Sequence, residues 1–232
     1  MKTVAIGDIH GCYDELAALI ETVKEKEELT KENCRWVFLG DYIDRGDDSR
    51  RVIALIRKMQ KEENNVVALM GNHEAQFLRW KITNSVIWFI NGGEKTLDSY
   101  GSRNDEFISD SAWIKNLRAF YQDEHFIFVH AGIVPEVPLE KQSEHDLLWI
   151  REPFIKATGG FPKTVIFGHT PTLHLNNTAK PMKTVAGNIN IDTGCVFGGT
   201  LTALVTEDGK IKKAYCIRQR SLKLTEYGPD EF

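Results

Sequence analysis

Five short apolar segments, each ending at or beside a glycine and a polar side chain, constrain the fold more than any other feature. They are VAIGD (4–8), WVFLGD (36–41), VVALMGN (66–72), FIFVHAG (126–132) and TVIFGH (164–169). Each is rich in β-branched or aromatic residues and is continuously apolar, whereas a half-exposed strand alternates. The pattern predicts strands buried on both faces, as in a sheet that helices cover.

Helical periodicity separates these segments. One set of apolar residues with helical spacing follows Asp14, which could cap the helix, and a second set follows Asp48 and Ser49. The members are Leu16, Leu19, Ile20 and Val23, then Val52, Ile53, Leu55, Ile56 and Met59. Strand and helix in alternation predict an α/β fold with a parallel or mixed sheet.

Two later parts of the chain depart from this alternation. Residues 74–120 contain EAQFLRW and SAWIKNLRAF, and they predict a helical insertion. Its NGGEKT segment (91–96) could be a glycine loop near the substrate, but it lacks the spacing of a phosphate loop and is better read as a turn between helices. After residue 185 the segments NINIDTG, GTLTALV and KAYCIRQR predict strands, with Asp208-Gly209 as one of the turns. With no convincing linker in the sequence, we expect a single domain over residues 1–232.

The ends of the five predicted strands carry polar side chains of metal-ligand type. Ligands of α/β sheets bind outside the carboxyl ends of strands. One histidine after an apolar run is most often structural, but the same arrangement at five strand ends favours a binding site. The residues concerned are Asp8, His10, Asp41, Asp44, Arg45, Asn72, His73, His130 and His169.

Carboxylate, imidazole and amide oxygen together suit divalent ions such as manganese, iron or zinc. A bridging aspartate can hold two such ions ~3.5–4 Å apart, and a solvent hydroxide that both ions share is a nucleophile for phosphoryl transfer. This chemistry needs no covalent nucleophile.

Composition excludes several other classes of function. The hydrophobic fraction of 42% and charged fraction of 27% are ordinary for a globular protein, and the net charge of −4 favours neither a nucleic acid polymer nor an anionic membrane as partner. No stretch approaches the ~18 apolar residues of a membrane span. Four widely spaced cysteines suggest reduced thiols, so we expect a cytoplasmic protein. They are Cys12, Cys34, Cys195 and Cys216.

The motifs GDIHG, GDYIDRG, GNHE, HAG and GH occur in this order between residues 7 and 169. In this they resemble the metallophosphoesterases of the phosphoprotein phosphatase family, and most of all the compact bacterial and bacteriophage lambda-type Ser/Thr protein phosphatases. The resemblance implies a β-sandwich flanked by helices that hydrolyses phosphomonoesters with two divalent metal ions. Mn²⁺ is the first candidate, and Fe, Zn, Ni or Co are alternatives.

The resemblance also implies a role for each residue. Asp8 and His10 would bind the first ion, Asp41 would bridge both ions, and Asn72, His130 and His169 would complete the second. His73 would protonate the leaving oxygen, with Asp44 orienting its ring. Arg45 would bind the phosphate in bidentate fashion.

Several of these residues have plainer alternatives. Arg45 could form a surface ion pair. Arg151, in LLWIREPF, matches the expected second phosphate-binding arginine only loosely and could be structural. Glu74 is expected to start a helix, where a carboxylate favours the N-terminus, rather than to act in catalysis. Cys12, at the edge of the site, could be an unreactive packed side chain or a thiol that is sensitive to oxidation.

Aromatic residues of the insertion also allow two interpretations. Trp80, Trp88, Phe89 and Trp113 could form a wall for a nucleobase, but aromatic residues at helical spacing are more often core.

Two substrate classes fit the motifs. A Ser/Thr protein phosphatase is the first, and a hydrolase of dinucleoside polyphosphates such as diadenosine tetraphosphate is the alternative. The symmetrical bacterial tetraphosphatases usually have Gln where this chain has His10, which favours the phosphatase. A catalytically inactive binding module would lack ligands, and all six predicted ligands are present.

Overall fold

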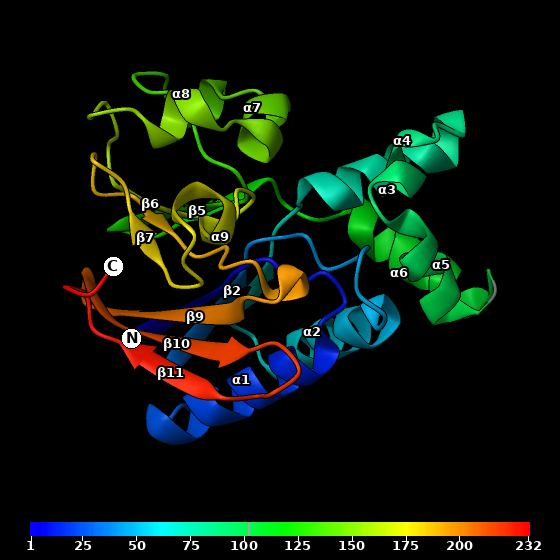
Figure 1. Ribbon diagram of the computed structural model, residues 1–232, viewed down its shortest axis with the longest axis horizontal. Coiled ribbons are helices and arrows are strands. Elements are labelled where there is room, and N and C mark those ends of the chain that lie inside the picture. Colours follow the sequence, from blue (N-terminus) through cyan, green and yellow to red (C-terminus); the bar gives the residue numbers. More distant parts are fainter. Residues whose placement is uncertain (102) are drawn as a thin grey trace.

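The computed structural model describes residues 1–101 and 103–232. Two β-sheets lie face to face, and helices cover their outer faces (Figure 1). This is the predicted α/β sandwich flanked by helices.

The first sheet has the strand order β11-β10-β9-β1-β2-β3. In chain order its strands are β1 (Lys2–Ile6), β2 (Cys34–Phe38), β3 (Val66–Ala68), β9 (Thr200–Glu207), β10 (Lys210–Arg218) and β11 (Leu224–Tyr227). Strands β1, β2 and β3 pair in parallel, and β9 joins β1 antiparallel. Asp208 and Gly209 form the predicted turn between β9 and β10; both have positive φ, which suits a tight hairpin.

The second sheet has the order β4-β5-β6-β8-β7. Its strands are β4 (Phe120–Gln122), β5 (Phe126–Val129), β6 (Thr164–Phe167), β7 (Met182–Lys183) and β8 (Ile189–Asn190). Strands β5, β6 and β8 pair in parallel. All five predicted strands therefore form, and the polar residues of interest follow them in loops.

The strands are apolar on both faces because each face packs against a different layer. In β1, Val4 and Ile6 belong to the hydrophobic cluster under the helices, while Ala5 faces the cluster between the sheets. In β5, Phe128 faces the space between the sheets, and Ile127 faces the outer cluster on the other side of the molecule. Side chains alternate along a strand, so two buried faces require a continuous apolar run.

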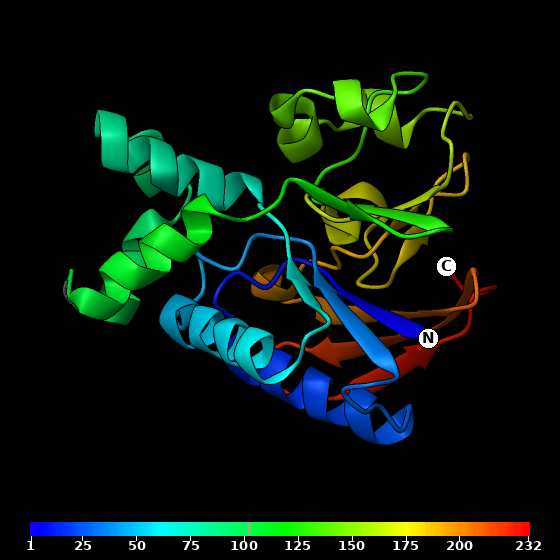
Figure 2. The same ribbon diagram turned by 180° about the vertical axis from the view of Figure 1, so that it is seen from behind.

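Helices α1 (Tyr13–Lys26) and α2 (Ser49–Glu62) cover the outer face of the first sheet, as Figure 2 shows from behind. The prediction that Asp14 caps α1 is wrong. Cys12 occupies the cap position without a side-chain hydrogen bond within the described part of the chain, and Asp14 lies in the first turn. There its carboxylate still favours the positive end of the helix dipole.

The helical insertion projects to one side of the sheets (Figures 1 and 2). It contains α3 (Asn72–Thr83), α4 (Ile87–Ile90), α5 (Gly93–Tyr100) and α6 (Asp105–Lys115). Helix α3 begins two residues before the predicted boundary. The NGGEKT segment is only partly a turn: Gly92 has φ +94°, and α5 begins at Gly93, where any side chain would collide with the Trp88 ring.

Aromatic packing holds the insertion together. Trp80 and Trp88 are buried with ring centroids 4.5 Å apart, and Phe77 packs edge-on against Trp88 and Phe107. The core interpretation is therefore correct for these two tryptophans, while Phe89 is 36% exposed.

The remaining short helices lie around the second sheet. They are α7 (Glu144–Trp149), α8 (Glu152–Ile155) and α9 (Thr172–Asn176), with a 3-10 turn at Leu139–Lys141. A second 3-10 turn, Cys195–Phe197, leads into β9 and packs against the first sheet. The four cysteines are buried free thiols. Among the described residues, no helix combines the length and the apolar character that crossing a bilayer requires.

Candidate active site

The loops that follow β1, β2, β3, β5 and β6 meet at one end of the two sheets. The six residues predicted as metal ligands all lie in these loops, or at the start of α3, and all are buried. They are Asp8, His10, Asp41, Asn72, His130 and His169.

Three of these side chains converge on one point from three loops. The Asn72 Oδ1 atom lies 2.9 Å from His130 Nε2 and 2.9 Å from His169 Nδ1. Asp41 completes the group, with Oδ1 3.5 Å from His130 Nε2. Atoms that bind a common ion at about 2.1 Å lie roughly 3 Å apart, so this spacing suits a single divalent ion.

The other oxygen of Asp41 faces a second group. Its Oδ2 atom lies 3.4 Å from His10 Nε2, and the Asp8 carboxylate accepts a hydrogen bond from the His169 amide at 3.1 Å. The Asp41 carboxylate thus stands between the two histidine groups, which is the geometry a bridging ligand requires.

Hydrogen bonds to the backbone orient two of the histidines. His10 Nδ1 donates to the Ile43 carbonyl at 2.8 Å, and His130 Nδ1 donates to the Leu39 carbonyl at 3.1 Å. A carbonyl only accepts, so in the neutral form of each ring the proton is on Nδ1 and Nε2 carries the lone pair that can bind a metal ion. Burial lowers the pKa of both rings and of His169, which favours the neutral form that binds metal.

Glu74 holds the backbone of the loop that carries Asp41. One oxygen of its carboxylate accepts from the Asp41 amide and the other from the Tyr42 amide, both at 2.8 Å. Burial, aided by the Asp41 charge, raises the pKa of Glu74 to about 8. As predicted, Glu74 lies in the first turn of α3, and it also holds the Asp41 loop in its left-handed conformation, φ +52°.

Asp192 is a site residue that the sequence analysis missed. It lies just beyond β8 and is buried beside Asp8, whose pKa is raised by burial and by the charges of Asp192 and Asp41. Burial raises the pKa of Asp192 itself to about 7, and the Asp41 charge adds to the effect. The run NINID, which ends in Asp192 before Thr193-Gly194, repeats the strand-end pattern of the predicted ligands and is the sequence signal that identifies this residue.

A buried group of carboxylates is unfavourable unless a cation compensates its charge. Among the described residues, two groups that share Asp41 each bring their ligand-type atoms within 4.8 Å of one another: Asp41 with His10 and His73, and Asp41 with His130 and His169. Carboxylate, neutral imidazole and the Asn72 amide oxygen beside them fit divalent metal ions.

His73 and Asp44 form a pair next to this group. His73 Nδ1 lies 2.7 Å from Asp44 Oδ2, and the His73 ring meets the His10 ring edge-on at 4.6 Å between centroids. Burial raises the pKa of Asp44, and the contact with His73 opposes the rise.

The insertion holds Asp44 in place, which sequence reasoning did not anticipate. Trp88 Nε1 donates to both Asp44 oxygens at 2.9 Å, and Thr96 Oγ1 donates to Asp44 Oδ1 at 2.6 Å. Thr96 belongs to the NGGEKT segment, whose Gly92 carbonyl also accepts from the Arg45 amide at 3.2 Å.

Both predicted arginines lie beside the ligands. Arg45 Nη1 is 2.7 Å from His10 Nε2, and the guanidinium packs over the Phe197 ring. Arg151 Nη1 donates to Thr170 Oγ1 at 3.1 Å, next to His169. Arg45 therefore points into the site instead of into a surface ion pair, and Arg151 lies within reach of the same space.

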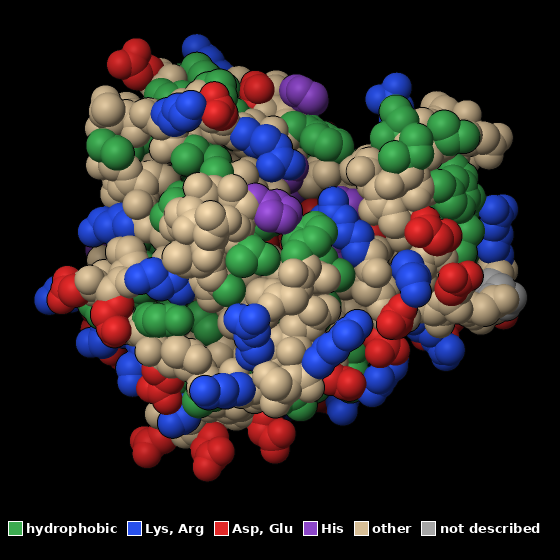
Figure 3. Space-filling model, viewed as in Figure 1, with side chains coloured by type: hydrophobic (Ala, Val, Ile, Leu, Met, Phe, Trp, Pro, Cys, Tyr) green, Lys and Arg blue, Asp and Glu red, His purple; other side chains and the backbone are tan. Residues whose placement is uncertain are grey.

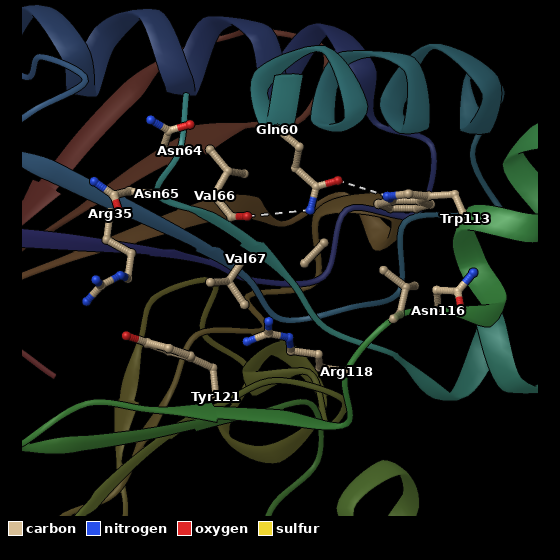
Figure 4. A pocket seen from close by; sticks show the side chains of 12 residues that line it. Arg35, Gln60, Asn64, Asn65, Val66, Val67, Trp113, Asn116, Arg118 and Tyr121 are labelled. Atoms are coloured by element: carbon tan, nitrogen blue, oxygen red, sulfur yellow. Dashed lines mark hydrogen bonds between the residues drawn. The ribbon is translucent and has the colours of Figure 1, made fainter. Parts of the chain in front are cut away.

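The surface is hollowed above this site. Figure 3 shows a notch between the part of the molecule that carries α7 and the part that carries α3 and α4, with histidine, arginine or lysine, and acidic atoms at its base. A different cavity, of about 350 Å³, lies beside β3 and is lined by Arg35, Arg118 and Tyr121 among others (Figure 4). None of the predicted site residues lines that cavity, so it is not the site of this chemistry.

Comparison with known proteins agrees with this geometry. The model of the calcineurin-like phosphoesterase family matches residues 1–200. An asymmetrical bis(5'-nucleosyl)-tetraphosphatase, PrpE, of Oceanobacillus iheyensis is 32% identical over 234 residues, covering 88% of each chain. PrpE proteins of other bacteria match at 27–30% identity. Serine/threonine-protein phosphatase 1 of Salmonella typhimurium is 32% identical over 217 residues, covering 85% of this chain and 88% of the relative.

Among solved structures, a candidate diadenosine tetraphosphatase superposes with a TM-score of 0.67 at 21% identity, covering 94% of this chain and 93% of the other. At this identity the structural similarity shows the fold alone. The family match and the relatives at 32% identity show to which family the chain belongs. The chain belongs to the calcineurin-like phosphoesterase family.

Proposed function

We propose that this phosphoesterase hydrolyses dinucleoside polyphosphates, with diadenosine tetraphosphate as the representative substrate. Most of the similar relatives described above are bis(5'-nucleosyl)-tetraphosphatases, and they include asymmetrical enzymes. The presence of His10 in place of Gln argues only against the symmetrical type. The protein phosphatase, expected first from the sequence, therefore becomes the second candidate.

The convergence of ligand atoms on both sides of Asp41 carries the proposal that the reaction depends on metal. Asp8, His10 and Asp41 would hold one ion, and Asp41, Asn72, His130 and His169 the other. When bound, the two divalent ions, with Mn²⁺ the first candidate, supply Lewis acidity and lower the pKa of water toward neutrality.

In this proposal His73 is the general acid. Its Nδ1–H is held by the Asp44 carboxylate, so a proton on Nε2 is the one available to a leaving oxygen. Trp88 and Thr96 fix the Asp44 carboxylate and so fix the ring that it orients.

Arg45 and Arg151 bind the phosphate oxygens. A guanidinium offers paired donors that match two oxygens of one phosphoryl group, so the two arginines hold it against the ligand group from two different loops.

The second candidate, a Ser/Thr protein phosphatase, is favoured by the Salmonella relative and by the buried His73–Asp44 pair. A serine alkoxide is a poor leaving group and needs a proton more than a nucleotide phosphate does.

The test compares kcat/KM for diadenosine tetraphosphate and for a phosphoserine peptide on manganese-loaded enzyme. We expect the dinucleotide to be preferred by at least tenfold. A preference for the peptide would reverse the order of the two candidates, and failure to hydrolyse either would refute both.

A further inference from the structure

A small cavity lies between the helical insertion and the end of α7. Its volume is about 230 Å³, and its walls include Gln76 and Arg79 of α3, Ile87 and Trp88 of α4, and Trp149 of α7. In Figure 3 the notch lies between the same two parts of the molecule. The cavity is smaller than the ~300 Å³ at which pockets for drug-sized ligands begin, so it suits a single ring system.

The cavity shares its walls with the active site. Gln76 is one helical turn beyond Asn72 and His73 on α3. Trp88, which also lines the cavity, donates to Asp44 at 2.9 Å. The Trp149 ring meets the His169 ring edge-on at 6.0 Å between centroids. A ligand whose phosphate lies at the histidines can therefore extend directly into this cavity.

One polar group in the cavity wall lacks a partner. Gln76 is only 7% exposed, and its Oε1 atom accepts from Asn91 Nδ2 at 2.6 Å. Its Nε2 atom is buried and has no hydrogen-bond partner among the described residues. A buried donor without an acceptor costs free energy, so a ligand that offers an acceptor at this position gains affinity.

We propose that this cavity binds a nucleobase of the substrate, with Trp149 as an aromatic contact and a ring nitrogen or carbonyl of the base accepting from Gln76 Nε2. This rests on the proposed function only for the source of the base, a nucleoside polyphosphate whose phosphates lie at the histidines. Arg79, exposed at the rim, adds a cation beside the polyphosphate.

The polar group decides between a base and an apolar peptide side chain. A leucine or phenylalanine of a phosphopeptide would fill the cavity but leave Gln76 Nε2 without an acceptor. A base combines a flat face, which stacks on aromatic rings, with acceptors on its edge, so it matches both the tryptophan and the amide.

The experiment measures Kd by calorimetry for AMP and for ribose 5-phosphate on the manganese-loaded enzyme. Both ligands carry the same phosphomonoester, and they differ in the base. We expect AMP to bind about 5- to 150-fold more tightly, since stacking of a base on an aromatic side chain is worth ~1–3 kcal/mol. Gln76→Leu and Trp149→Leu should each reduce this ratio severalfold, while Gln219→Leu, outside the cavity, should leave it unchanged.

Equal affinity for AMP and ribose 5-phosphate would overturn the nucleobase site, even if diadenosine tetraphosphate is hydrolysed. A preference for AMP that both cavity variants retain would also overturn it, because the base would then bind elsewhere. A preference for AMP that the variants lose, in an enzyme that does not cleave the dinucleotide, would support the site and refute the proposed substrate. The two proposals can thus fail separately.

Discussion

The loops at the strand ends and the helical insertion build the active site by different physical means. The loops are set by the sheets: each predicted ligand follows a buried strand within a few residues, so pairing of the strands brings the ligands together. The insertion is set by side-chain packing, in which Trp80, Trp88 and Phe77 form an aromatic cluster. Its contribution to the site is to hold Asp44 and to line the cavity beside it.

The difference suggests a division of tasks. The strand-end residues carry the charges and the ligand-type atoms on which, in our proposal, phosphoryl transfer depends. The insertion holds Asp44, the hydrogen-bond partner of His73, and lines the cavity in which we propose that the rest of the substrate binds. Changes in the loops should therefore abolish turnover, whereas changes in the insertion should alter its rate, pH dependence and selectivity.

Asp41→Asn should have the largest effect. It removes the charge shared by both ligand groups, a loss of several kcal/mol of transition-state stabilisation, so kcat/KM should fall by about 10³-fold or more. Metal content, measured by mass spectrometry, should fall below two ions per chain. Asp47→Asn, at an exposed carboxylate in the same loop, is the control. Two tightly bound ions in the Asp41 variant would contradict the bridging role.

His73→Asn should keep the metal ions and slow the hydrolysis of a phosphoserine peptide by ~10²–10⁴-fold, the usual contribution of a general acid. The loss should be smaller for p-nitrophenyl phosphate, whose leaving group scarcely needs a proton. His125→Asn, at an exposed histidine, serves as the control. An equal loss on both esters would rule out proton donation by His73.

Thr96→Val tests whether the insertion acts through Asp44. A hydrogen bond to a charged group is worth ~1.5–3 kcal/mol, so we expect a loss in kcat of roughly tenfold. The Thr96 hydroxyl stabilises the Asp44 carboxylate and lowers its pKa; without the hydroxyl that pKa rises, and the acidic limb of the pH–rate profile should move to higher pH.

The same substitution in a His73→Asn background should cause no further loss, because the two residues act in one chain of contacts. Additive losses would mean that Thr96 acts independently of His73. Thr83→Val, on the exposed end of α3, provides the matched control.

The smallest effect concerns the stability of the metal-free protein. Burial raises the pKa of Asp192 from its ordinary value of 3.8 to about 7, so between these values the folded chain binds more protons than the unfolded chain. The stabilising contribution of the protonated group is complete below pH 4 and is lost as the pH rises through 7. This group changes the free energy of unfolding by at most about 1.4 kcal/mol per pH unit.

Chemical denaturation of the metal-free protein at several pH values measures this slope. Asp192→Asn should reduce the dependence of the free energy of unfolding on pH between pH 4 and 7. Asp208→Asn, at an exposed carboxylate, should leave it unchanged. A slope that is the same in the Asp192 variant would show that Asp192 is ionised throughout.

Much of the site could be predicted because most of its residues lie within a few positions of the strand that places them. A buried parallel strand requires a continuous apolar run, and the residue after it must lie at the carboxyl edge. The same rule applies to Asp192, but β8 is only two residues long, so its apolar run does not stand out within the β-rich tail. The ligand and catalytic roles, the single domain and the cytoplasmic location stay predictions.

The sequence by itself determined the strands, the order of the motifs and the set of ligand atoms, because each of these follows from spacing within one short segment. Only the tertiary structure decided which atoms of the insertion meet them. Trp88 and Thr96 reach Asp44 across 44 and 52 residues of chain, and Trp149 comes to face the insertion from a helix beyond β5. Such contacts depend on how one layer packs on another, which no local pattern encodes.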